Sequence, residues 1–435
     1  CTKGAVLDVV VDMREDSPTY GKYTAVELTP ENGRKLYVPR GYAHGFLALT
    51  DNATFNYKVD NEYAPRTEGG VLWNDPEINI PWDEIFEKYG IDKPLLSDKD
   101  RDRIPLSEAD IKFLRRPKRY LVTGFNGQLG YDIVRELNDR GEDDVLAIDK
   151  DEMDITDKES VMKIVKAYKP DVIFHCAAWT AVDKAEDDTK RIIKEIVDDK
   201  IVEKELPSNK EMCEMVNVLG TKNITDASIE VGAKLVYMST DYVFDGEKPL
   251  DEKYKEDDTP NPKSVYGDTK YRGEEEVRRN PNHFITRISW VFGINGNNFI
   301  KTILKAAKKH PQLTVVNDQI GSPTYTVDLA KKLVSMVHTE DYGTYHITND
   351  GYCSWYDLAD HVIKYMEIPC KVIPVTTEEY YEGKDTSKVA KRPYNSQLEE
   401  EKYKEKYESM PSWQDGADRY CKELKKSKKW WLENL

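Results

Sequence analysis

The chain has 435 residues, so at roughly 150 residues per domain its length predicts two or three domains. It carries 64 Lys and Arg against 80 Asp and Glu, and this net charge of −16 argues against electrostatic binding of nucleic acid or of an anionic membrane surface. With 39% hydrophobic residues and 27 Tyr, the composition is that of a globular protein rather than a disordered one.

The sequence shows no sign of membrane insertion or export. No run approaches the ~18 consecutive apolar residues of a spanning helix, and residues 1–15 lack the apolar block and cleavage site of a signal peptide. A cytoplasmic location is therefore expected. The six cysteines are scattered without a CxxC pair, so neither structural disulfides nor a cysteine metal site is expected. The chain begins with Cys1 rather than Met and continues into a strand-like run, which suggests that a preceding segment has been removed.

The first part of the chain alternates short β-rich runs with turn clusters such as TPENG, PRG and TDN. The runs span residues 5–13, 23–28, 35–38, 46–50 and 54–59. This spacing is typical of an antiparallel sheet or barrel. We therefore predict a partial antiparallel β domain, cupin-like or jelly-roll-like, over residues 1–100. Dense charge and few apolar residues then predict a linker over residues 101–118.

From residue 119 onward, short apolar strands alternate with helical stretches, the pattern of βαβ units in a doubly wound parallel sheet. The predicted strands carry the sequences YLVTG, VLAID, DVIFHCAA, KLVYMST and HFITR. Helices are predicted over residues 132–140 and 158–168, and the charged interval 187–211 is predicted to be an exposed helical insertion. The predicted fold class is α/β, with a Rossmann-type domain over residues 119–435 that includes a small C-terminal substrate subdomain.

The first predicted strand-to-helix turn reads TGFNGQLG, with Gly124, Gly127 and Gly130 at intervals of three residues. Glycines there let the backbone turn tightly and approach a pyrophosphate, which the N–H groups of the following helix can bind. The next strand ends in Asp149, where a carboxylate can accept a hydrogen bond from a ribose hydroxyl. These features predict a dinucleotide cofactor. Asp149 favours NADH over NADPH, but Lys150 beside it offsets that charge, so both cofactors stay open.

A second group of residues has the chemistry of ketone reduction. Tyr266 and Lys270 are four residues apart at the start of a predicted helix, so both lie on one helix face. An ammonium beside a phenol lowers the phenol pKa, which would let Tyr266 protonate the alkoxide that hydride addition leaves. Ser239, Thr240 and Asp241 follow a predicted strand at the sheet edge where ligands bind. A hydroxyl at that edge can hydrogen-bond a substrate carbonyl.

A run of longer motifs narrows the family. The segments TGFNGQLG, CAAWTAVDKAE, STDYVFDG, VYGDTK, TRISWVFG, GNNF, VNDQIGSPT and KRPYNSQL all occur in order. With them, residues 119–435 resemble the extended short-chain dehydrogenase/reductases, and more narrowly the dTDP-4-dehydrorhamnose reductase family. The resemblance implies reduction of dTDP-4-dehydro-β-L-rhamnose to dTDP-β-L-rhamnose with NADPH or NADH. It also implies substrate-binding parts near residues 242–263, 290–325 and 343–435.

Matched position by position, the resemblance implies three catalytic residues. Tyr266 would supply the proton, Lys270 would tune it and hold the nicotinamide ribose, and Thr240 would contact the sugar ketone. The implied cofactor contacts are Gly124, Gly127, Gln128, Leu129, Gly130, Asp149, Asp154, Ile155, Ala178, Thr180, Tyr266 and Lys270. The implied substrate contacts are Val182, Thr240, Asp241 and Trp290.

The resemblance also raises the question of a metal. Some relatives hold a magnesium ion between subunits with three glutamates, and the matching residues here are Asp132, Asp328 and Glu423. Two of the three are shortened to aspartate, which disfavours Mg²⁺ as a cofactor and metal-mediated dimerisation, so no metal ligand is predicted. The partners expected are a dTDP-sugar and a second copy of the chain, with the barrel domain as the dimer contact.

The N-terminal segment resembles a second family. The run from DVVVDMREDSPTYGKY to YAHGFLALTD, with FNYKVDNEYAP, VLWNDPEI and LLSDKD, is similar to the second half of the dTDP-4-dehydrorhamnose 3,5-epimerases. The resemblance matches Tyr57 to the catalytic tyrosine, Asp100 to the carboxylate that orients the histidine base, and His44 to a pocket histidine. The base itself would precede Cys1, so no epimerase activity is expected. We favour the remnant or cut end of a bifunctional fusion over an epimerase-derived module kept for assembly or substrate handling.

Two other functions stay open. One is a reductase, or a bifunctional epimerase and reductase, for another nucleotide-linked 4-ketosugar such as a UDP sugar. The other is a non-catalytic subunit that senses the cofactor and regulates a partner. The intact set of Thr240, Tyr266 and Lys270 weighs against the second.

Overall fold

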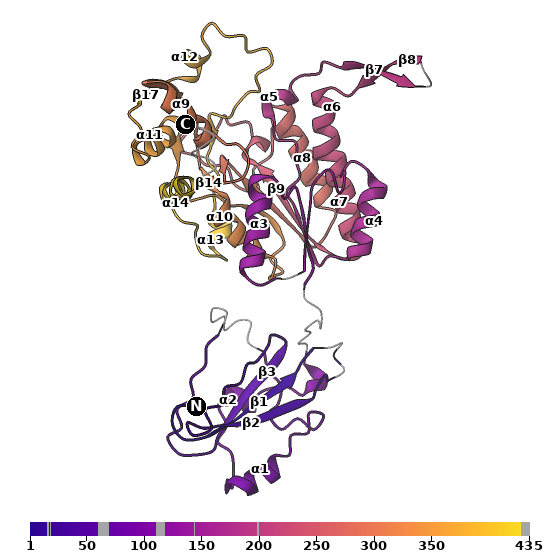
Figure 1. The fold of residues 1–435 in the computed structure, drawn as a ribbon, viewed down its shortest axis with the longest axis vertical. Coiled ribbons are helices and arrows are strands. Elements are labelled where there is room, and N and C mark those ends of the chain that lie inside the picture. The colour runs from indigo at the N-terminus through magenta and orange to yellow at the C-terminus, as the bar shows by residue number, and fades with distance from the viewer. Residues whose placement is uncertain are drawn as a thin grey trace. The chain divides into compact units, whose positions relative to one another are not determined.

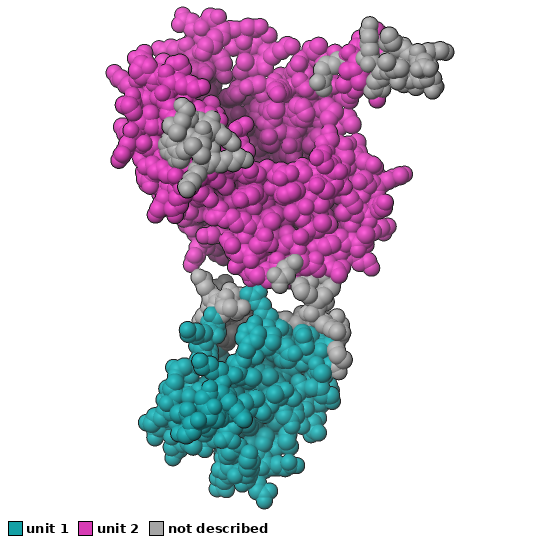
Figure 2. All heavy atoms as spheres, in the orientation of Figure 1, with its two compact units in different colours: residues 1–117 teal, residues 118–435 magenta. Residues whose placement is uncertain are grey.

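Figure 1 shows the computed structural model, which describes residues 1–14, 17, 19–59, 69–109, 118–142, 144–197 and 200–427. The chain divides into two compact units, Cys1–Pro117 and Lys118–Leu435, coloured teal and magenta in Figure 2. Residues 110–117 of the predicted linker lie outside the described residues. Within the described ranges, no helix is long and apolar enough to cross a membrane.

The N-terminal unit is built on an antiparallel sheet of β1 (Val6–Asp12), β2 (Tyr23–Leu28) and β3 (Tyr42–Ala48), in the order β2-β1-β3. The central strand β1 has the sequence VLDVVVD and is buried along its whole length. The two further strands predicted over residues 35–38 and 54–59 do not form, apart from an isolated bridge at Thr54. Their β-rich composition is not sufficient, because a strand also needs a paired neighbour.

One face of this sheet is covered by the segment 69–109. That segment contains α1 (Trp82–Tyr89), α2 (Asp98–Arg101) and the short helix η2 (Leu106–Glu108). Ile78 and Leu106 from this segment pack with Val11 and Met13 in a small core.

The second unit contains a six-stranded sheet whose neighbouring strands are all parallel, in the order β15-β10-β9-β6-β4-β5. The strands are β4 (Tyr120–Thr123), β5 (Val145–Ile148), β6 (Val172–His175), β9 (Lys234–Thr240), β10 (His283–Ile288) and β15 (Gly343–His346). The predicted α/β class and its five strands are confirmed, and β15 was not predicted. The strand order reverses between β4 and β6, and ligands bind at such switch points in open α/β sheets.

Helices cover both faces of this sheet, as the near-continuous apolar strands require. Successive strand residues point to opposite faces. On β4, Tyr120 and Val122 pack with residues of α3 (Gln128–Asp139) and α10 (Thr326–Met336), whereas Leu121 packs with α4 (Lys158–Tyr168) and α7 (Thr221–Val231). In Figure 1 these two helix pairs flank the sheet on opposite sides.

The remaining elements of the second unit surround the carboxyl ends of the strands or form its C-terminal part. The helical ones are α5 (Val182–Ala185), α6 (Asn209–Glu214), η3 (Met215–Gly220), η4 (Asp241–Val243), α8 (Val265–Val277), α9 (Phe299–Lys309), α11 (Trp355–Tyr365), α12 (Thr377–Tyr381), α13 (Glu401–Lys404) and α14 (Trp413–Lys426). The short strands are β11 (Val291–Phe292), β12 (Gln312–Val316), β13 (Ile320–Gly321), β14 (Thr324–Tyr325), β16 (Cys353–Ser354), β17 (Lys371–Val375) and β18 (Asn395–Ser396).

The predicted helical insertion at 187–211 is wrong. The described residues there form two paired antiparallel strands, β7 (Arg191–Val197) and β8 (Lys200–Leu206), with Ile192 opposite Glu205. The hairpin extends away from the body of its unit in Figure 1, and α6 begins only after it. The segment contains several Ile and Val, whose branched side chains favour strands over helices. Its high charge, which suggested a solvated helix, is equally compatible with a solvated hairpin.

A buried ion pair joins the helix α8 to the sheet. Arg287 of β10 and Glu274 of α8 are 1% and 0% exposed. Arg287 Nε and Nη2 donate to the two Glu274 oxygens at 2.9 and 2.8 Å, and Ser239 at the end of β9 donates to the same carboxylate at 2.6 Å. Burial opposes ionisation of Glu274, but these hydrogen bonds and the positive charge of Arg287 lower its pKa.

We expect Glu274→Ala to lower the free energy of unfolding of this unit by about 3–5 kcal/mol, because it leaves the Arg287 guanidinium buried without a counter-charge. Urea denaturation measures the change. The control is Glu275→Ala, an exposed neighbour on the same helix, for which a change within about 0.5 kcal/mol is expected. Equal stability of the two variants would contradict this account of the ion pair.

Candidate functional site

A cavity of about 790 Å³ opens at the carboxyl ends of the sheet strands. Its lining includes the last residues of β4, β5, β9 and β10, and the loop that follows β6. Every reductase-site residue proposed from the sequence lines this cavity: Gly124, Gly127, Gln128, Leu129, Gly130, Asp149, Asp154, Ile155, Ala178, Thr180, Val182, Thr240, Asp241, Tyr266, Lys270 and Trp290. The structure thus brings together residues that are up to 166 positions apart, and their individual roles stay predictions.

The glycine turn after β4 forms a cradle in the cavity wall. Gly124 has a φ of +70°, and a Cβ there would lie 2.7 Å from the backbone nitrogen of Ala177. A Cβ on Gly130 would collide with the carbonyl oxygen of Gly124. Gly127 begins α3 without a side-chain cap, which leaves the first N–H groups of that helix for an anion. These residues fit the pyrophosphate of a dinucleotide.

The loop after β5 supplies carboxylates to the same cavity. Asp149 accepts a hydrogen bond from the backbone N–H of Lys150 at 2.8 Å, and both residues line the cavity. Asp154 accepts from the backbone N–H and the hydroxyl of Thr156 at 2.9 and 2.7 Å. Burial opposes ionisation of Asp154, but these bonds lower its pKa. Asp149 and Asp154 are therefore available as acceptors for hydroxyl groups of a cofactor.

The predicted catalytic set converges from two elements. Thr240 is the last residue of β9, and Tyr266 and Lys270 project from adjacent turns of α8. Ser264 caps α8 by accepting from the N–H of Gly267 at 3.1 Å, which fixes where the helix begins. The Tyr266 ring packs edge-on against Tyr242, with ring centroids 5.6 Å apart.

The Tyr266 pKa is raised in the structure, and not lowered as expected from the neighbouring Lys270. Burial is the main reason that the pKa of Tyr266 lies above its ordinary value, and the negative charge of Asp241 raises it further. Burial also lowers the pKa of Lys270 to about 7. The Lys270 ammonium lies over the ring of Tyr237, 4.0 Å from its centroid. Desolvation therefore keeps Tyr266 in the protonated form that a proton donor needs.

Asp241 is held between two hydroxyl groups. Thr240 Oγ1 donates to Asp241 Oδ1 at 2.9 Å, and Ser396 Oγ donates to Oδ2 at 2.6 Å. Burial raises the Asp241 pKa to about 6, although both hydrogen bonds act in the opposite direction. The carboxylate is thus mainly ionised at neutral pH and lies beside the predicted proton donor.

Two tryptophans form an aromatic wall of the cavity. Trp290, predicted at the substrate, has a φ of +48° and stacks on Trp355, with ring centroids 3.6 Å apart and planes at 11°. A Cβ on Gly321 would lie 2.7 Å from the Trp290 indole, so only glycine leaves room for the ring. Trp355 in turn donates from Nε1 to Gln319 at 3.2 Å. The indole of Trp290 is therefore fixed on two sides.

Several residues of this site were not found from the sequence. Trp355, Tyr242 and Met212 line the cavity, and Ser396 contacts Asp241. Ser396 belongs to the KRPYNSQL motif, which the sequence analysis quoted without giving it a role. Trp355 and Met212 lie in segments with no chemical signature, so only the tertiary structure identifies them.

The three residues proposed for the N-terminal unit do not form one constellation. His44 Nε2 lies 2.5 Å from Asp8 Oδ1, a buried carboxylate of β1. Tyr57 is 69% exposed. The ring centroid of Phe55 lies 6.0 Å from that of Tyr57 and 6.3 Å from that of His44. Asp100 accepts from Ser97 within α2. The histidine is thus paired with Asp8, and Asp100 has a separate partner in Ser97.

Two of the three carboxylates at the positions of the family's magnesium ligands accept hydrogen bonds from arginines, whereas the third, Asp132, accepts one from Thr326. Asp328 accepts from both terminal nitrogens of Arg419 at 2.8 and 2.5 Å. Glu423 accepts from Arg135 at 2.9 Å, and Arg135 also lies 3.6 Å from Asp132. Among the described residues no cluster of three or more His, Cys, Asp or Glu side chains suits a metal ion. The residues present do not fit Mg²⁺.

A parallel sheet with this glycine turn at its switch point, and with a Tyr/Lys pair facing the same cavity, defines a dinucleotide-binding reductase of the short-chain dehydrogenase/reductase class. Residues 118–204 and 198–426 match the family model described as RmlD substrate binding domain. The chain belongs to this family.

The known relatives agree with that assignment. The dTDP-4-dehydrorhamnose reductase of Aggregatibacter actinomycetemcomitans is 38% identical over 310 residues, covering 68% of this chain and 96% of that protein. The corresponding reductase of Escherichia coli K12 is 33% identical, covering 70% of this chain and 97% of that protein. A solved dTDP-4-dehydrorhamnose reductase from Bacillus anthracis, in complex with NADP, has a TM-score of 0.62 and 38% identity, covering 71% of this chain and all 100% of the other.

The N-terminal resemblance is confirmed as well. Residues 1–108 match the family model described as dTDP-4-dehydrorhamnose 3,5-epimerase. The match covers the β1–β3 sheet and the segment that packs on it. The chain therefore joins sequences related to two enzymes that are both named for the same dehydrorhamnose sugar.

We expect that EDTA, and then Mg²⁺ added in excess, will change neither the melting temperature nor the sedimentation coefficient. The arginine guanidinium groups already neutralise Asp328 and Glu423 and leave no site for a cation. A bound ion at one hundred times its Kd would add about 2.7 kcal/mol of stability, which thermal denaturation resolves easily. A melting temperature that rises with Mg²⁺ concentration would overturn this interpretation.

Proposed function

We propose that this chain reduces the 4-keto group of dTDP-4-dehydro-β-L-rhamnose to give dTDP-β-L-rhamnose, with NADPH or NADH as the reductant. The observation that carries the proposal is the convergence of Thr240, Tyr266 and Lys270 on the cavity that also contains the glycine cradle. The reductase names of the relatives and the NADP bound in the Bacillus anthracis structure support it.

In the proposed ketone reduction, each of the three catalytic residues has a separate role. A bound nicotinamide supplies the hydride that reaches the ketone carbon. The Thr240 hydroxyl, which donates to Asp241 in the absence of substrate, would turn its single proton to the ketone oxygen and stabilise the negative charge that develops there. Tyr266, which burial keeps protonated, donates its proton to the resulting alkoxide. Lys270 holds the nicotinamide ribose and provides a positive charge near the developing alkoxide.

The sugar end of the cavity has both polar and apolar walls. Asp241 offers carboxylate oxygens to sugar hydroxyls, whereas the fixed indole of Trp290 offers a flat apolar surface. A deoxysugar presents both surfaces, since one carbon carries a methyl group instead of a hydroxyl. Val182 at the start of α5 completes this end of the cavity.

The choice of cofactor and the base of the sugar nucleotide are each tested by a direct comparison of two compounds. Asp149 and Lys150 lie side by side in the cavity, where they would face the cofactor ribose, so NADH and NADPH should be assayed in parallel. The base on the sugar nucleotide is tested in the same way, with dTDP- and UDP-linked 4-ketosugars supplied at equal concentration. Faster turnover of the UDP compound would replace the proposed substrate with another nucleotide sugar.

We expect Tyr266→Phe to lower kcat by about 10²–10⁴-fold, the usual contribution of a general acid, while NADPH affinity stays unchanged. NADPH oxidation at 340 nm and fluorescence titration measure the two effects. Tyr271→Phe on the same helix is the matched control, because this ring packs in a core cluster outside the cavity lining. Full turnover in Tyr266→Phe would rule out the assigned role.

The non-catalytic alternative has a distinct signature. Wild-type protein that binds NADPH but does not oxidise it with any nucleotide 4-ketosugar would be a cofactor sensor. The same titration and assay therefore separate an enzyme from a regulatory subunit.

For the N-terminal unit we propose that it does not epimerise the sugar in this chain. Proton removal from C3 or C5 needs a base and an acid on one substrate, but His44 is paired with Asp8, Tyr57 is largely exposed and Asp100 is bound to Ser97. We expect no deuterium at C3 or C5 when the chain is incubated with substrate in D₂O and examined by mass spectrometry. Incorporation that His44→Gln abolishes would show that the His44–Asp8 pair is a working base.

A further inference from the structure

The KRPYNSQL segment, residues 391–398, has no role in the mechanism above, yet it reaches the centre of the site. Its residues Asn395 and Ser396 form β18, which pairs in parallel with β13 so that Ser396 lies opposite Gly321. Gly321 is also the residue that makes room for the Trp290 indole. The segment therefore pairs with the strand that makes room for the Trp290 indole, although none of its residues lines the cavity.

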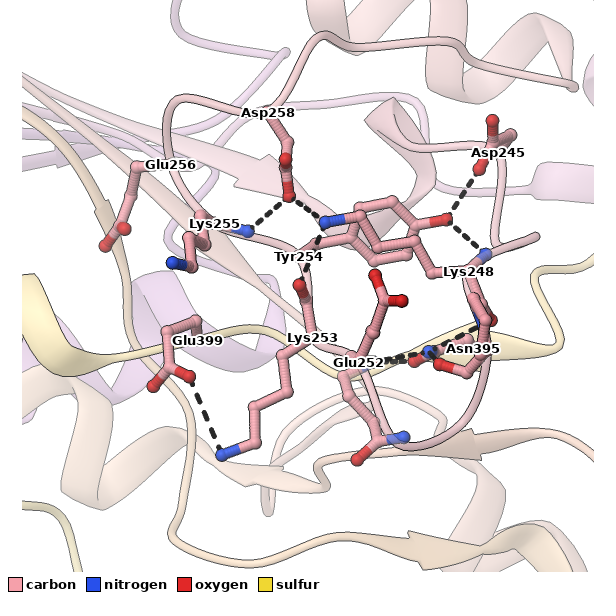
Figure 3. Close-up of polar contacts among 12 residues, drawn as sticks. Asp245, Lys248, Glu252, Lys253, Tyr254, Lys255, Glu256, Asp258, Asn395 and Glu399 are labelled. Carbon is pink, nitrogen blue, oxygen red and sulfur yellow. Dashed lines mark hydrogen bonds and ion pairs between the residues drawn. The ribbon is translucent and has the colours of Figure 1, made fainter.

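Asn395 joins this segment to the loop 245–258 by hydrogen bonds, as Figure 3 shows. Its Nδ2 donates to the carbonyl oxygens of Pro249 and Glu252, each at 2.9 Å, and its backbone N–H donates to Gly246 at 3.1 Å. The side chain is 1% exposed. These bonds leave the neighbouring residue Ser396 with little freedom to move.

The loop itself is braced by its own polar contacts (Figure 3). Tyr254 donates to Asp245 at 2.5 Å, and Lys248 forms an ion pair with Asp258 at 2.5 Å. Lys253 lies 3.7 Å from Glu399, just beyond the KRPYNSQL segment. The position of Ser396 is therefore set by a network outside the cavity rather than by Asp241 alone.

Ser396 completes a buried hydroxyl–carboxylate–hydroxyl array. Ser396 and Asp241 are 2% and 4% exposed, so water does not readily replace a lost hydrogen bond. Ser396 donates to Oδ2 of Asp241, and Thr240 donates to Oδ1. Because each oxygen has its own donor, the plane of the carboxylate is fixed, and the carboxylate in turn holds the Thr240 side chain beside it.

We propose that Ser396 is a positioning residue for the reduction, whose hydroxyl keeps the Asp241 carboxylate ionised and oriented so that Thr240 is correctly placed at the sugar ketone. This inference rests on the proposed function. It assigns Ser396 no contact with the substrate, and it gives the KRPYNSQL segment a role in setting the geometry of the catalytic set.

The sign of the expected pH effect follows from the hydrogen bond. The Ser396 bond favours the ionised form of Asp241, so its removal raises the Asp241 pKa above its value of about 6. The other titratable groups that face this region are Tyr242, Tyr266 and Lys270. Burial keeps both phenols neutral near pH 6, and the Lys270 pKa of about 7 does not depend on Ser396. A difference between wild type and a Ser396 variant therefore reports on Asp241.

The test is the pH profile of kcat for Ser396→Ala in the full chain. We expect the acid limb to move upward by about one pH unit, with kcat at pH 6 reduced roughly fivefold and NADPH affinity unchanged. Ser396→Cys, which is slightly larger but keeps a weak donor, should fall between wild type and the alanine variant. In an Asp241→Asn background, Ser396→Ala should produce no further shift, because no carboxylate is left to titrate.

A matched control removes another buried serine hydroxyl. Ser228→Ala on α7 deletes a donor to the Thr225 carbonyl, away from the cavity lining, and should leave the acid limb in place. An unshifted limb in Ser396→Ala, or the same shift in Ser228→Ala, would overturn the proposal.

A second measurement does not require turnover. In ¹³C-aspartate-labelled protein, the carboxyl signal of Asp241, identified by its loss in Asp241→Asn, should titrate at higher pH in Ser396→Ala than in wild type. An unchanged midpoint would refute the role of Ser396 even in active protein. If wild type reduces no nucleotide ketosugar, the proposed function fails, whereas the titration still decides whether Ser396 controls Asp241.

Discussion

The guanidinium of Arg287 lies inside the reductase unit, and the arrangement of the site depends on its pairing with Glu274. Arg287 belongs to β10, Glu274 to α8, and Ser239 at the end of β9 donates to the same carboxylate. Because a buried charge cannot be left unpaired, α8 is held in one position on the sheet. Tyr266 and Lys270 project from that helix, and Thr240 follows Ser239 directly. The ion pair therefore sets the distance between the proton donor and the hydroxyl at the ketone.

Burial then decides the protonation states that the chemistry uses. Desolvation keeps the Tyr266 phenol protonated and brings the Lys270 pKa down to about 7. It also brings the Asp241 pKa up to about 6, so two oppositely charged groups of the site titrate near neutrality. The net charge of −16 does not oppose anionic ligands here, since the glycine cradle and the start of α3 bind anions through backbone N–H groups. Local donors, and not total charge, determine what this cavity can hold.

Burial and charge pairing also determine the arrangement of side chains in the N-terminal unit. Its central strand β1 is buried along its whole length, and Asp8 on that strand is paired with His44. The rings of Phe46, Phe55 and Tyr57 lie close together on the exposed side of β3. The match to the epimerase model extends over this sheet, but the residues that the resemblance assigned to catalysis do not meet in the unit.

The sequence by itself determined the α/β class, the glycine turn, and the Tyr266/Lys270 pair, because each depends on short-range periodicity or on the spacing of a few residues. It also determined both family resemblances. It failed where a long-range neighbour decides the outcome. Strands β7 and β8 pair as a hairpin, the run 35–38 finds no partner strand, and burial reverses the expected shift of the Tyr266 pKa. Contacts such as Ser396 with Asp241 join residues 155 positions apart, so only the tertiary structure, which sets packing and desolvation, could decide them.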